Sequence, residues 1–486
     1  CDAFNYYNPV KQAQMYGNNT NPTSTSALEK TMWYDLLTSI KYRPVYNTED
    51  HIIADSSKRY DHNIAYHVGA DIWQGALHGR GYTNIWVWSR KYYDEALANS
   101  ILTRPDAIME VSRSSLDLNR LSYEAAALAD KNPDTALLWS DTSRIYQNSY
   151  ANNLYKAYEA SVYSGQKTGF VSENNIEKAY NHKVLICPDV VNIKEENARK
   201  LLDYAKSGRK LVLLGSDSLT RDEHNQPLDE NLVRELHENA QIIETVNDSF
   251  KMTSPENLQK LLSDIYDSLG MRRVRVVHAE TGEDIKQVEY MYTEYNGKLL
   301  VNLNLYDWAE DVNIKILADG QEVQNSTELR SMTEQGNVVT LQTHQPILLE
   351  IGGTSYSEPN EIKLRIDDPI LINGGFRRAI DVKNYSTAPI IQNDRTLLPV
   401  RAIAENIGGE AEWDDTARTA TLKYNGREIK LTIDSDTAYI DGREEKLDSV
   451  PTISNDRIML PLRFVAESFG LNVSWDGAAR IVTVKK

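Results

Sequence analysis

Cysteine and long apolar segments are nearly absent from this sequence. Only Cys1 and Cys187 occur among the 486 residues, and they show no metal or redox spacing. Disulfides are therefore not expected to stabilise the fold, which fits a cytosolic protein or a secreted one from a lineage that avoids cysteine. No run of about 18 apolar residues occurs, so no membrane span is predicted. The sequence starts with Cys and shows no signal peptide, and we expect it to be the C-terminal part of a longer protein.

Positive charge is also scarce. The 53 Lys and Arg residues face 70 Asp and Glu residues, which gives a net charge of −17 and argues against a nucleic-acid partner. Hydrophobic residues make up 41% and charged residues 25%, the balance of folded globular proteins. There are only 6 Phe but 28 Tyr, a residue that suits carbohydrate contact and is equally common on ordinary surfaces. The length predicts about three or four domains.

Strand and helix patterns alternate through residues 1–133. Helical spacing over 27–40 precedes a candidate strand at 44–49. A second helix beginning near Asn63 is followed by a Gly-rich break at Gly79 and Gly81 and then by a candidate strand at 83–88. A further candidate strand covers 1–7, and a single helix is expected over 106–132. This order predicts a parallel α/β sheet, in which polar residues at the carboxyl ends of strands form the site. Glu49 ends one strand, and Trp86 and Trp88 end the next.

Residues 134–250 predict a flavodoxin-like, doubly wound domain. Continuous apolar strands at 136–139, 183–186 and 210–214 alternate with helices at 150–163 and 195–207. Cys187 ends a strand as a nucleophile would. It is followed by Pro188 and lacks the flanking glycines of a nucleophile elbow, so we expect a buried thiol.

Residues 251–352 predict a small β-sandwich. A helix from Pro255 to Gly270 leads into strands alone, and Asn296-Gly297 predicts a hairpin turn. The clearest strands are 288–295, 298–305 and 347–351.

The last part of the chain contains an internal repeat. A linker at 352–361 precedes a unit at 362–486, in which segments of about 389–423 and 451–485 match in register 62 positions apart (457 − 395). Each copy predicts a short helix, 400–407 or 462–469, followed by strands. The shared residues and pairs are Arg401 with Glu405, Arg463 with Glu467, and the tryptophans Trp413 and Trp475.

The shared residues are predicted to be structural. We expect the Arg–Glu pairs to brace the helices and the tryptophans to form the core of each copy. A sugar-binding role for the tryptophans is the alternative.

Residues 1–133 resemble the closing strands six to eight of the (β/α)₈ barrel of retaining glycoside hydrolases, in the clan that includes family 42 β-galactosidases. The resemblance implies that Glu49 is the nucleophile and that Trp88, or alternatively Trp86, contacts the sugar. Asn47, His51 and Tyr6 are further candidates for substrate contact, and Asn47, Tyr46 or His51 could keep the nucleophile ionised.

Two consequences of this resemblance are expected. The acid/base Glu of the clan belongs to strand four, so this chain is expected to supply only one of the two carboxyl groups. The alternative is that Glu49 is a solvated loop carboxylate and that the two tryptophans fill a barrel core. Asp50 also lies at the strand end and is expected to be structural.

The other parts resemble known domains too. Residues 134–250 are similar to the middle, trimer-forming domain of family 42 β-galactosidases, with the best match over 180–215, and residues 251–352 are similar to their C-terminal domain. Residues 362–486 resemble the stalk domain named after the N-terminal domain of copper amine oxidase, found on surface proteins of Gram-positive bacteria. Neither copy has a His, so no copper or other cofactor is expected.

The sequence therefore predicts a multidomain α/β plus β protein. We expect a secreted or cell-surface fragment of a β-galactosidase-like retaining glycosidase, acting by double displacement on an oligo- or polysaccharide. A homotrimer and cell-wall association through the repeat are the candidate assemblies. The alternative is a non-catalytic carbohydrate-binding or structural surface protein.

Overall fold

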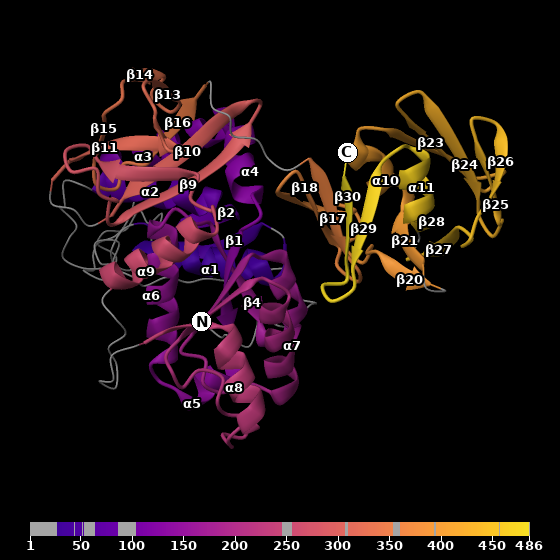
Figure 1. The fold of residues 1–486 in the computed structure, drawn as a ribbon. Helices are drawn as coiled ribbons and strands as arrows, with labels where there is room; N and C mark the ends of the chain where they lie inside the picture. The colour runs from indigo at the N-terminus through magenta and orange to yellow at the C-terminus, as the bar shows by residue number, and fades with distance from the viewer. Residues whose placement is uncertain are drawn as a thin grey trace. The chain divides into compact units, whose positions relative to one another are not determined.

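The structure is a computed structural model, and it forms two compact units, Cys1–Ser357 and Glu358–Lys486 (Figure 1). Their boundary lies within the segment 352–361 that the composition predicts to be a linker. The residues that the structure describes are 27–42, 44–50, 52, 64–85, 104–244, 255–306, 310–352, 360–392, 395–455 and 457–485.

The first unit begins with two helix–strand pairs. The elements are α1 (Ala27–Ile40), β1 (Val45–Asp50), α2 (Ile64–Leu77) and β2 (Arg80–Ile85). β1 and β2 pair in parallel, as the alternation of helix and strand predicts. β2 begins before the expected strand, and Gly81 lies inside it rather than in a break. A Cβ atom at Gly81 would lie 2.4 Å from the Cβ atom of Pro44, so the close approach of β1 requires glycine there.

Two helices follow where the sequence predicts one. α3 (Pro105–Arg120) and α4 (Ser122–Asp130) are separated at Leu121, whose φ of −105° and ψ of 28° interrupt the helix. α2 and α4 pack with the sheet of the β-sandwich around a shared apolar cluster that includes Trp73, Leu128 and Leu300.

A five-stranded parallel sheet follows. The strand order is β4-β3-β5-β6-β7. β3, which comes first in the sequence, therefore lies second from one edge, as it does in doubly wound sheets of the flavodoxin type. β3 and β5 are buried along their whole length, as their continuous apolar sequences predict. β4 and the short β7 are not predicted by the sequence patterns. The elements are β3 (Thr135–Trp139), α5 (Asp141–Tyr146), α6 (Tyr150–Tyr163), β4 (Thr168–Ser172), η4 (Glu173–Asn181), β5 (Val184–Pro188), α7 (Glu195–Lys206), β6 (Lys210–Leu214), α8 (Glu230–Asn239) and β7 (Gln241–Ile243).

Two antiparallel sheets complete the first unit. The first sheet has the strand order β14-β13-β16-β10-β9. The second sheet has the order β12-β11-β15, and β8 also pairs with β11. Asn296 and Gly297 have φ values of 51° and 73°, as a tight hairpin turn between β9 and β10 requires. The elements are α9 (Pro255–Ser268), β8 (Val274–His278), β9 (Val288–Tyr295), β10 (Lys298–Leu305), β11 (Val312–Ala318), β12 (Gln321–Glu322), β13 (Ser326–Glu328), β14 (Thr333–Gln335), β15 (Val339–Leu341) and β16 (Ile347–Ile351).

The second unit is built from two equivalent halves. Each half is a three-stranded meander, a hairpin, a short helix and a second hairpin. The first half contains β17 (Glu361–Arg365), β18 (Ile370–Asn373), β19 (Phe376–Ala379), β20 (Ile390–Gln392), β21 (Arg395–Pro399), α10 (Val400–Ile407), β22 (Glu410–Asp414) and β23 (Thr419–Tyr424). The second half contains β24 (Arg427–Thr432), β25 (Thr437–Ile440), β26 (Arg443–Lys446), β27 (Thr452–Ser454), β28 (Arg457–Pro461), α11 (Leu462–Ser468), β29 (Asn472–Asp476) and β30 (Ile481–Lys485).

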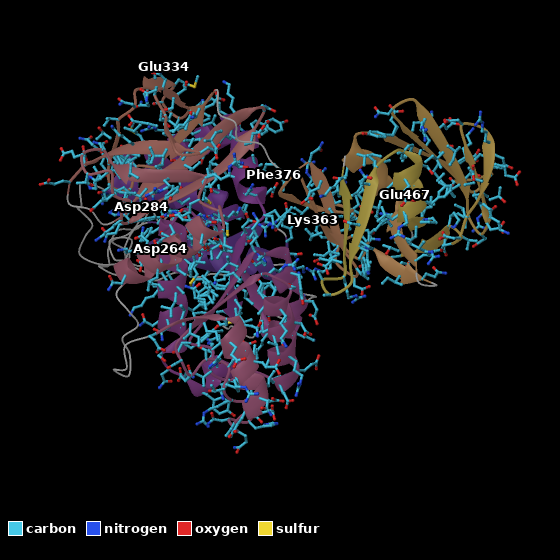
Figure 2. The ribbon with its side chains drawn as sticks, in the orientation of Figure 1. Asp264, Asp284, Glu334, Lys363, Phe376 and Glu467 are labelled. Atoms are coloured by element: carbon cyan, nitrogen blue, oxygen red, sulfur yellow. The ribbon has the colours of Figure 1, made fainter. Side chains whose placement is uncertain are left out.

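The halves exchange strands. Hairpin β22–β23 extends the meander of the second half, and hairpin β29–β30 extends the meander of the first half. β30 therefore pairs with β17, so the two ends of the unit lie side by side. The duplication thus includes a meander that the sequence repeat does not reveal. Figure 2 labels Lys363 on β17 and Glu467 on α11.

Candidate functional site

The carboxyl ends of β1 and β2 meet at one edge of their sheet. Asp50 is paired with Ile85, and Asn47 with Thr83, so three steps along β1 match two steps along β2. This irregularity contains Glu49, and β-bulges are frequent at barrel rims and next to active sites. The structure describes Glu49 as part of β1, whereas its side chain lies outside the described residues. Tyr6, His51, Trp86 and Trp88 also lie outside them.

The two faces of this small sheet differ. The Asn47 side chain is fully buried, and its Nδ2 donates to the hydroxyl of Tyr34 on α1 at 2.8 Å. Asn47 therefore faces the helix, and its predicted contact with substrate remains a prediction. Tyr46 and Tyr82 occupy the other face, 38% and 51% exposed, with their rings stacked at 4.2 Å and 6°. An exposed aromatic pair thus lies beside the strand ends.

Asp50 belongs to a buried ion cluster. Its carboxylate accepts from Lys30 Nζ at 3.1 Å and from Arg80 Nη1 at 2.7 Å, and both cations also contact Asp71. Thr83 Oγ1 donates to it at 2.5 Å. Burial opposes ionisation of Asp50, but the attraction of Lys30 and Arg80 outweighs it and lowers the pKa of Asp50 to about 2. These contacts fit the structural role expected for Asp50.

A second buried network centres on His78. His78 follows α2, and its Nδ1 lies 2.9 Å from Asp35 Oδ2 on α1 while its Nε2 lies 2.6 Å from Glu289 Oε1 on β9. Burial disfavours the imidazolium, but the two carboxylates outweigh it and raise the pKa of His78 to about 10. Both ring nitrogens therefore donate at neutral pH.

Neutral side chains complete this network. Tyr158 on α6 donates its hydroxyl to Asp35 at 2.8 Å, and Tyr306 donates to Glu289 at 2.8 Å. Gln74 Nε2 donates to Glu289 at 2.7 Å, and its Oε1 accepts from Asn302, which in turn accepts from the Trp73 indole. The network thus ties α1 and α2 to the parallel sheet's helix α6 and to the β-sandwich. No local pattern could have revealed it, because Glu289 lies 211 positions after His78.

The carboxyl edge of the parallel sheet is occupied by the protein's own groups. Glu173 accepts from Ser140 Oγ and from the backbone N–H of Thr142, at 2.8 and 2.9 Å. Asp189 accepts from Ser149 Oγ and Asn153 Nδ2 at 2.9 and 2.8 Å. Cys187 is fully buried, and burial raises its pKa, so it is the inert thiol that the sequence predicts.

Across the described residues, no group of three or more His, Cys, Asp or Glu side chains is placed to hold a metal ion. Within the same ranges, no helix is long and apolar enough to cross a membrane.

The repeated residues of the second unit lie at its surface. Arg463 and Glu467 are both exposed and 3.9 Å apart, whereas the Arg401 side chain lies outside the described residues. The prediction that Trp413 and Trp475 form the core was wrong, because their side chains are 37% and 42% exposed. Both lie on edge strands, and the core is formed by smaller aliphatic residues of the inner strands and helices together with Phe469.

Part of the second unit matches a known protein family. Residues 377–484 match the family model described as the copper amine oxidase N-terminal domain. No curated protein matches the sequence.

Solved structures share the fold of 70% of this chain. An apo exo-carrageenase of family GH42 from Bacteroides ovatus is 17% identical with a TM-score of 0.58, covering 70% of this chain and 46% of its own. A catalytic mutant of a GH42 β-galactosidase from G. stearothermophilus is 12% identical, with a TM-score of 0.52 and coverages of 70% and 59%. The β-galactosidase from Bacillus circulans sp. alkalophilus is 13% identical, with a TM-score of 0.51 and coverages of 70% and 60%.

This chain therefore spans about half the length of these structures. It joins a mixed α/β fold like that of GH42 enzymes to a copper amine oxidase N-terminal-type domain.

Proposed function

We propose that this chain is the C-terminal part of a retaining, β-galactosidase-like glycoside hydrolase, and that Glu49 is its nucleophile. In this mechanism Glu49 attacks the anomeric carbon, and a second carboxyl group about 5–5.5 Å away protonates the leaving oxygen. Water then hydrolyses the glycosyl-enzyme. The pair β1 and β2 would be strands seven and eight of a (β/α)₈ barrel.

One observation carries this proposal. β1 and β2 are adjacent and parallel, and the strand end that contains Glu49 lies beside Ile85, the residue before Trp86. Polar groups at the carboxyl ends of neighbouring parallel strands are the catalytic positions of α/β barrels. The likeness of the fold to GH42 structures, over 70% of the chain, supports the assignment.

The faces of the sheet support the same role. Asn47 and Asp50 contact α1 and its neighbours, so their face is the helix side. Tyr46 and Tyr82 lie on the opposite face. We propose that this tyrosine side faces the barrel interior, where a sugar ring could lie against exposed aromatic side chains.

The other parts of the chain would serve the oligomerisation of the enzyme and its attachment to the cell surface. The acid/base carboxyl group would come from an earlier strand of a longer protein. The flavodoxin-like sheet would form a homotrimer, and the tail would attach a secreted enzyme to the cell wall. Because the proposed enzyme is β-galactosidase-like, its substrate should contain galactose.

Azide rescue tests the nucleophile. In the longer protein that carries a complete barrel, Glu49→Gly should abolish hydrolysis of an activated aryl galactoside while leaving the melting temperature unchanged. Azide should then restore turnover and yield the inverted glycosyl azide, because a small anion fills the place of the carboxylate. Glu124→Gly, on α4, is the matched control and should keep wild-type rates. Wild-type turnover by the Glu49 variant would contradict the proposal.

A further inference from the structure

We propose that Trp413 and Trp475 are two equivalent binding platforms for a neutral polysaccharide chain on the second unit. The proposal rests on their exposure, on their equivalent positions in the two halves and on the charges around them. It does not depend on the glycosidase assignment of the first unit.

The two tryptophans occupy the same place in the two halves. Trp413 is the fourth residue of β22, and Trp475 is the fourth residue of β29; both strands form the edge of a five-stranded sheet. Trp413 is paired across the sheet with Ala420, and Trp475 with Val482, both fully or nearly fully buried. Each indole thus borders the buried face of its sheet while remaining open to solvent.

Packing accounts for only part of each tryptophan. Two positions earlier on the same face, Ala411 and Val473 pack against the core of the unit. Trp413 and Trp475 continue that face at the edge of each sheet, where 37% and 42% of their surface stays exposed. The recurrence of a large, partly open aromatic ring at both equivalent positions favours a use for its exposed face.

The neighbouring aspartates have a different role. Asp414 Oδ1 accepts from the backbone N–H groups of Thr416 and Ala417 at 2.8 and 2.9 Å. Asp476 Oδ1 accepts from the backbone N–H of Ala479 at 2.9 Å. These bonds shape the turn that follows each strand. The turn therefore accounts for Asp414 and Asp476, which follow the two tryptophans in sequence. It does not account for the exposed tryptophan that precedes each of them.

The chemistry of the surface points to sugar rings. The flat face of an indole suits the C–H face of a pyranose, and its N–H group adds a polar end. The indole N–H of Trp413 donates to Asp415, which restrains the ring. Glu410, Glu412 and Asp414 alternate with Trp413 along β22 and lie on the opposite side of the strand, where they are exposed. Their negative charge next to Trp413 disfavours an anionic polymer, so the expected ligand is uncharged.

Two platforms on one unit favour a polymer over a monosaccharide. Each platform alone offers one aromatic ring, which gives weak binding. A polymer offers many sugar units, so a protein with two platforms can bind it again through the second platform after one contact breaks, and its overall affinity rises.

Affinity electrophoresis tests this proposal on the whole chain. The protein is run in native gels that contain linear β-galactan, linear β-glucan or the sulfated polymer κ-carrageenan. We expect at least one neutral polymer to retard the wild-type chain and κ-carrageenan to retard it less. Trp413→Ala and Trp475→Ala should each weaken the apparent affinity about tenfold, and the double variant should migrate as in an empty gel.

Matched controls separate binding from folding and from the proposed catalytic site. Tyr439→Ala removes a ring of similar exposure from β25 and should keep full retardation. Glu49→Gln should also keep it, so loss of catalysis and loss of binding are distinguishable. All variants should keep the circular dichroism spectrum and the cooperative melt of the wild type, with a somewhat lower melting temperature for the Trp variants because part of each indole is covered. The proposal would be overturned if neither neutral polymer retarded the wild type, if the Trp variants were retarded as strongly as the wild type, or if κ-carrageenan retarded the wild type more strongly than the neutral polymers.

Discussion

The imidazole Nε2 of His78 lies 2.6 Å from the carboxylate of Glu289, although 211 positions separate the two residues in sequence. Both side chains are buried, and Asp35 contacts the opposite ring nitrogen. The contact fixes the end of α2, immediately before β2, against strand β9 of the β-sandwich. The strands that carry the proposed site are thus positioned by groups from three parts of the first unit.

Removing this cation should destabilise the first unit. His78→Gln leaves Asp35 and Glu289 as buried carboxylates without their cation, which costs about 3–5 kcal/mol in comparable cases. The free energy of unfolding from urea denaturation measures the loss. His224→Gln, at an exposed histidine, is the control and should change stability by less than about 0.5 kcal/mol. Equal stability of the two variants would show that the network contributes little.

The same contact predicts a loss of stability at high pH. The pKa of His78 is raised from 6.5 to about 10, so the folded state holds the proton more tightly than the unfolded state. The stabilisation is fully present below pH 6.5 and is lost as the pH rises through about 10. The stability difference between the wild type and His78→Gln should therefore shrink over this window. A difference that stays constant to pH 10.5 would mean that His78 is not the titrating group.

The contribution of Asp50 to stability should depend on pH in the opposite direction. Its pKa is lowered from 3.8 to about 2, so its contribution is present above pH 3.8 and is lost as the pH falls through about 2. At neutral pH, Asp50→Asn should destabilise the first unit by about 3–5 kcal/mol, because Lys30 and Arg80 lose a buried partner. Asp203→Asn, at an exposed position of α7, is the matched control. If both variants unfold at the same urea concentration, the cluster is not a stabilising one.

Gly81 should not tolerate a side chain. Gly81→Ala places a methyl group about 2.4 Å from Pro44 Cβ, so β1 and β2 must move apart. We expect a loss of about 1–3 kcal/mol, the usual cost of overpacking. Gly336→Ala meets no atom within 4 Å and should be neutral. Circular dichroism melts of the two variants provide the comparison, and an unchanged melt for Gly81→Ala would contradict the close approach of the strands.

The second unit should fold alone only when β17 is included. β17 pairs with β30, and Asp367, just after β17, accepts from Arg480 Nη2 at 2.9 Å. Residues 360–486 should therefore give a cooperative melt, whereas residues 380–486, which lack the first meander, should not. Cooperative melting of the shorter fragment would show that the exchange of strands between the halves is dispensable.

Local patterns predicted much of the fold. β9, β10, β16 and α6 begin and end where their apolar spacing and the Asn296-Gly297 turn predict. The short edge strands β4 and β7 were missed, since three to five residues with little periodicity give a weak signal. Gly81 was read as a break because a sequence cannot show that a neighbouring strand approaches closely.

The site was less accessible to sequence reasoning. The pattern placed Glu49 in a strand beside a second parallel strand, and the structure has that arrangement. It could not reveal the network of His78, whose partners come from distant segments. It also mistook Trp413 and Trp475 for core, because a repeat shows that a residue recurs and does not show which way it faces.

Trapping of the glycosyl-enzyme tests the central claim most directly. The longer protein with its complete barrel is incubated with an activated 2-deoxy-2-fluorogalactoside, which slows breakdown of the covalent intermediate, and is then digested and analysed by mass spectrometry. We predict that the fluorosugar is attached to Glu49 and that Glu49→Gln abolishes the label. A label on another carboxylate, together with full turnover by Glu49→Gln, would contradict the assignment of the nucleophile.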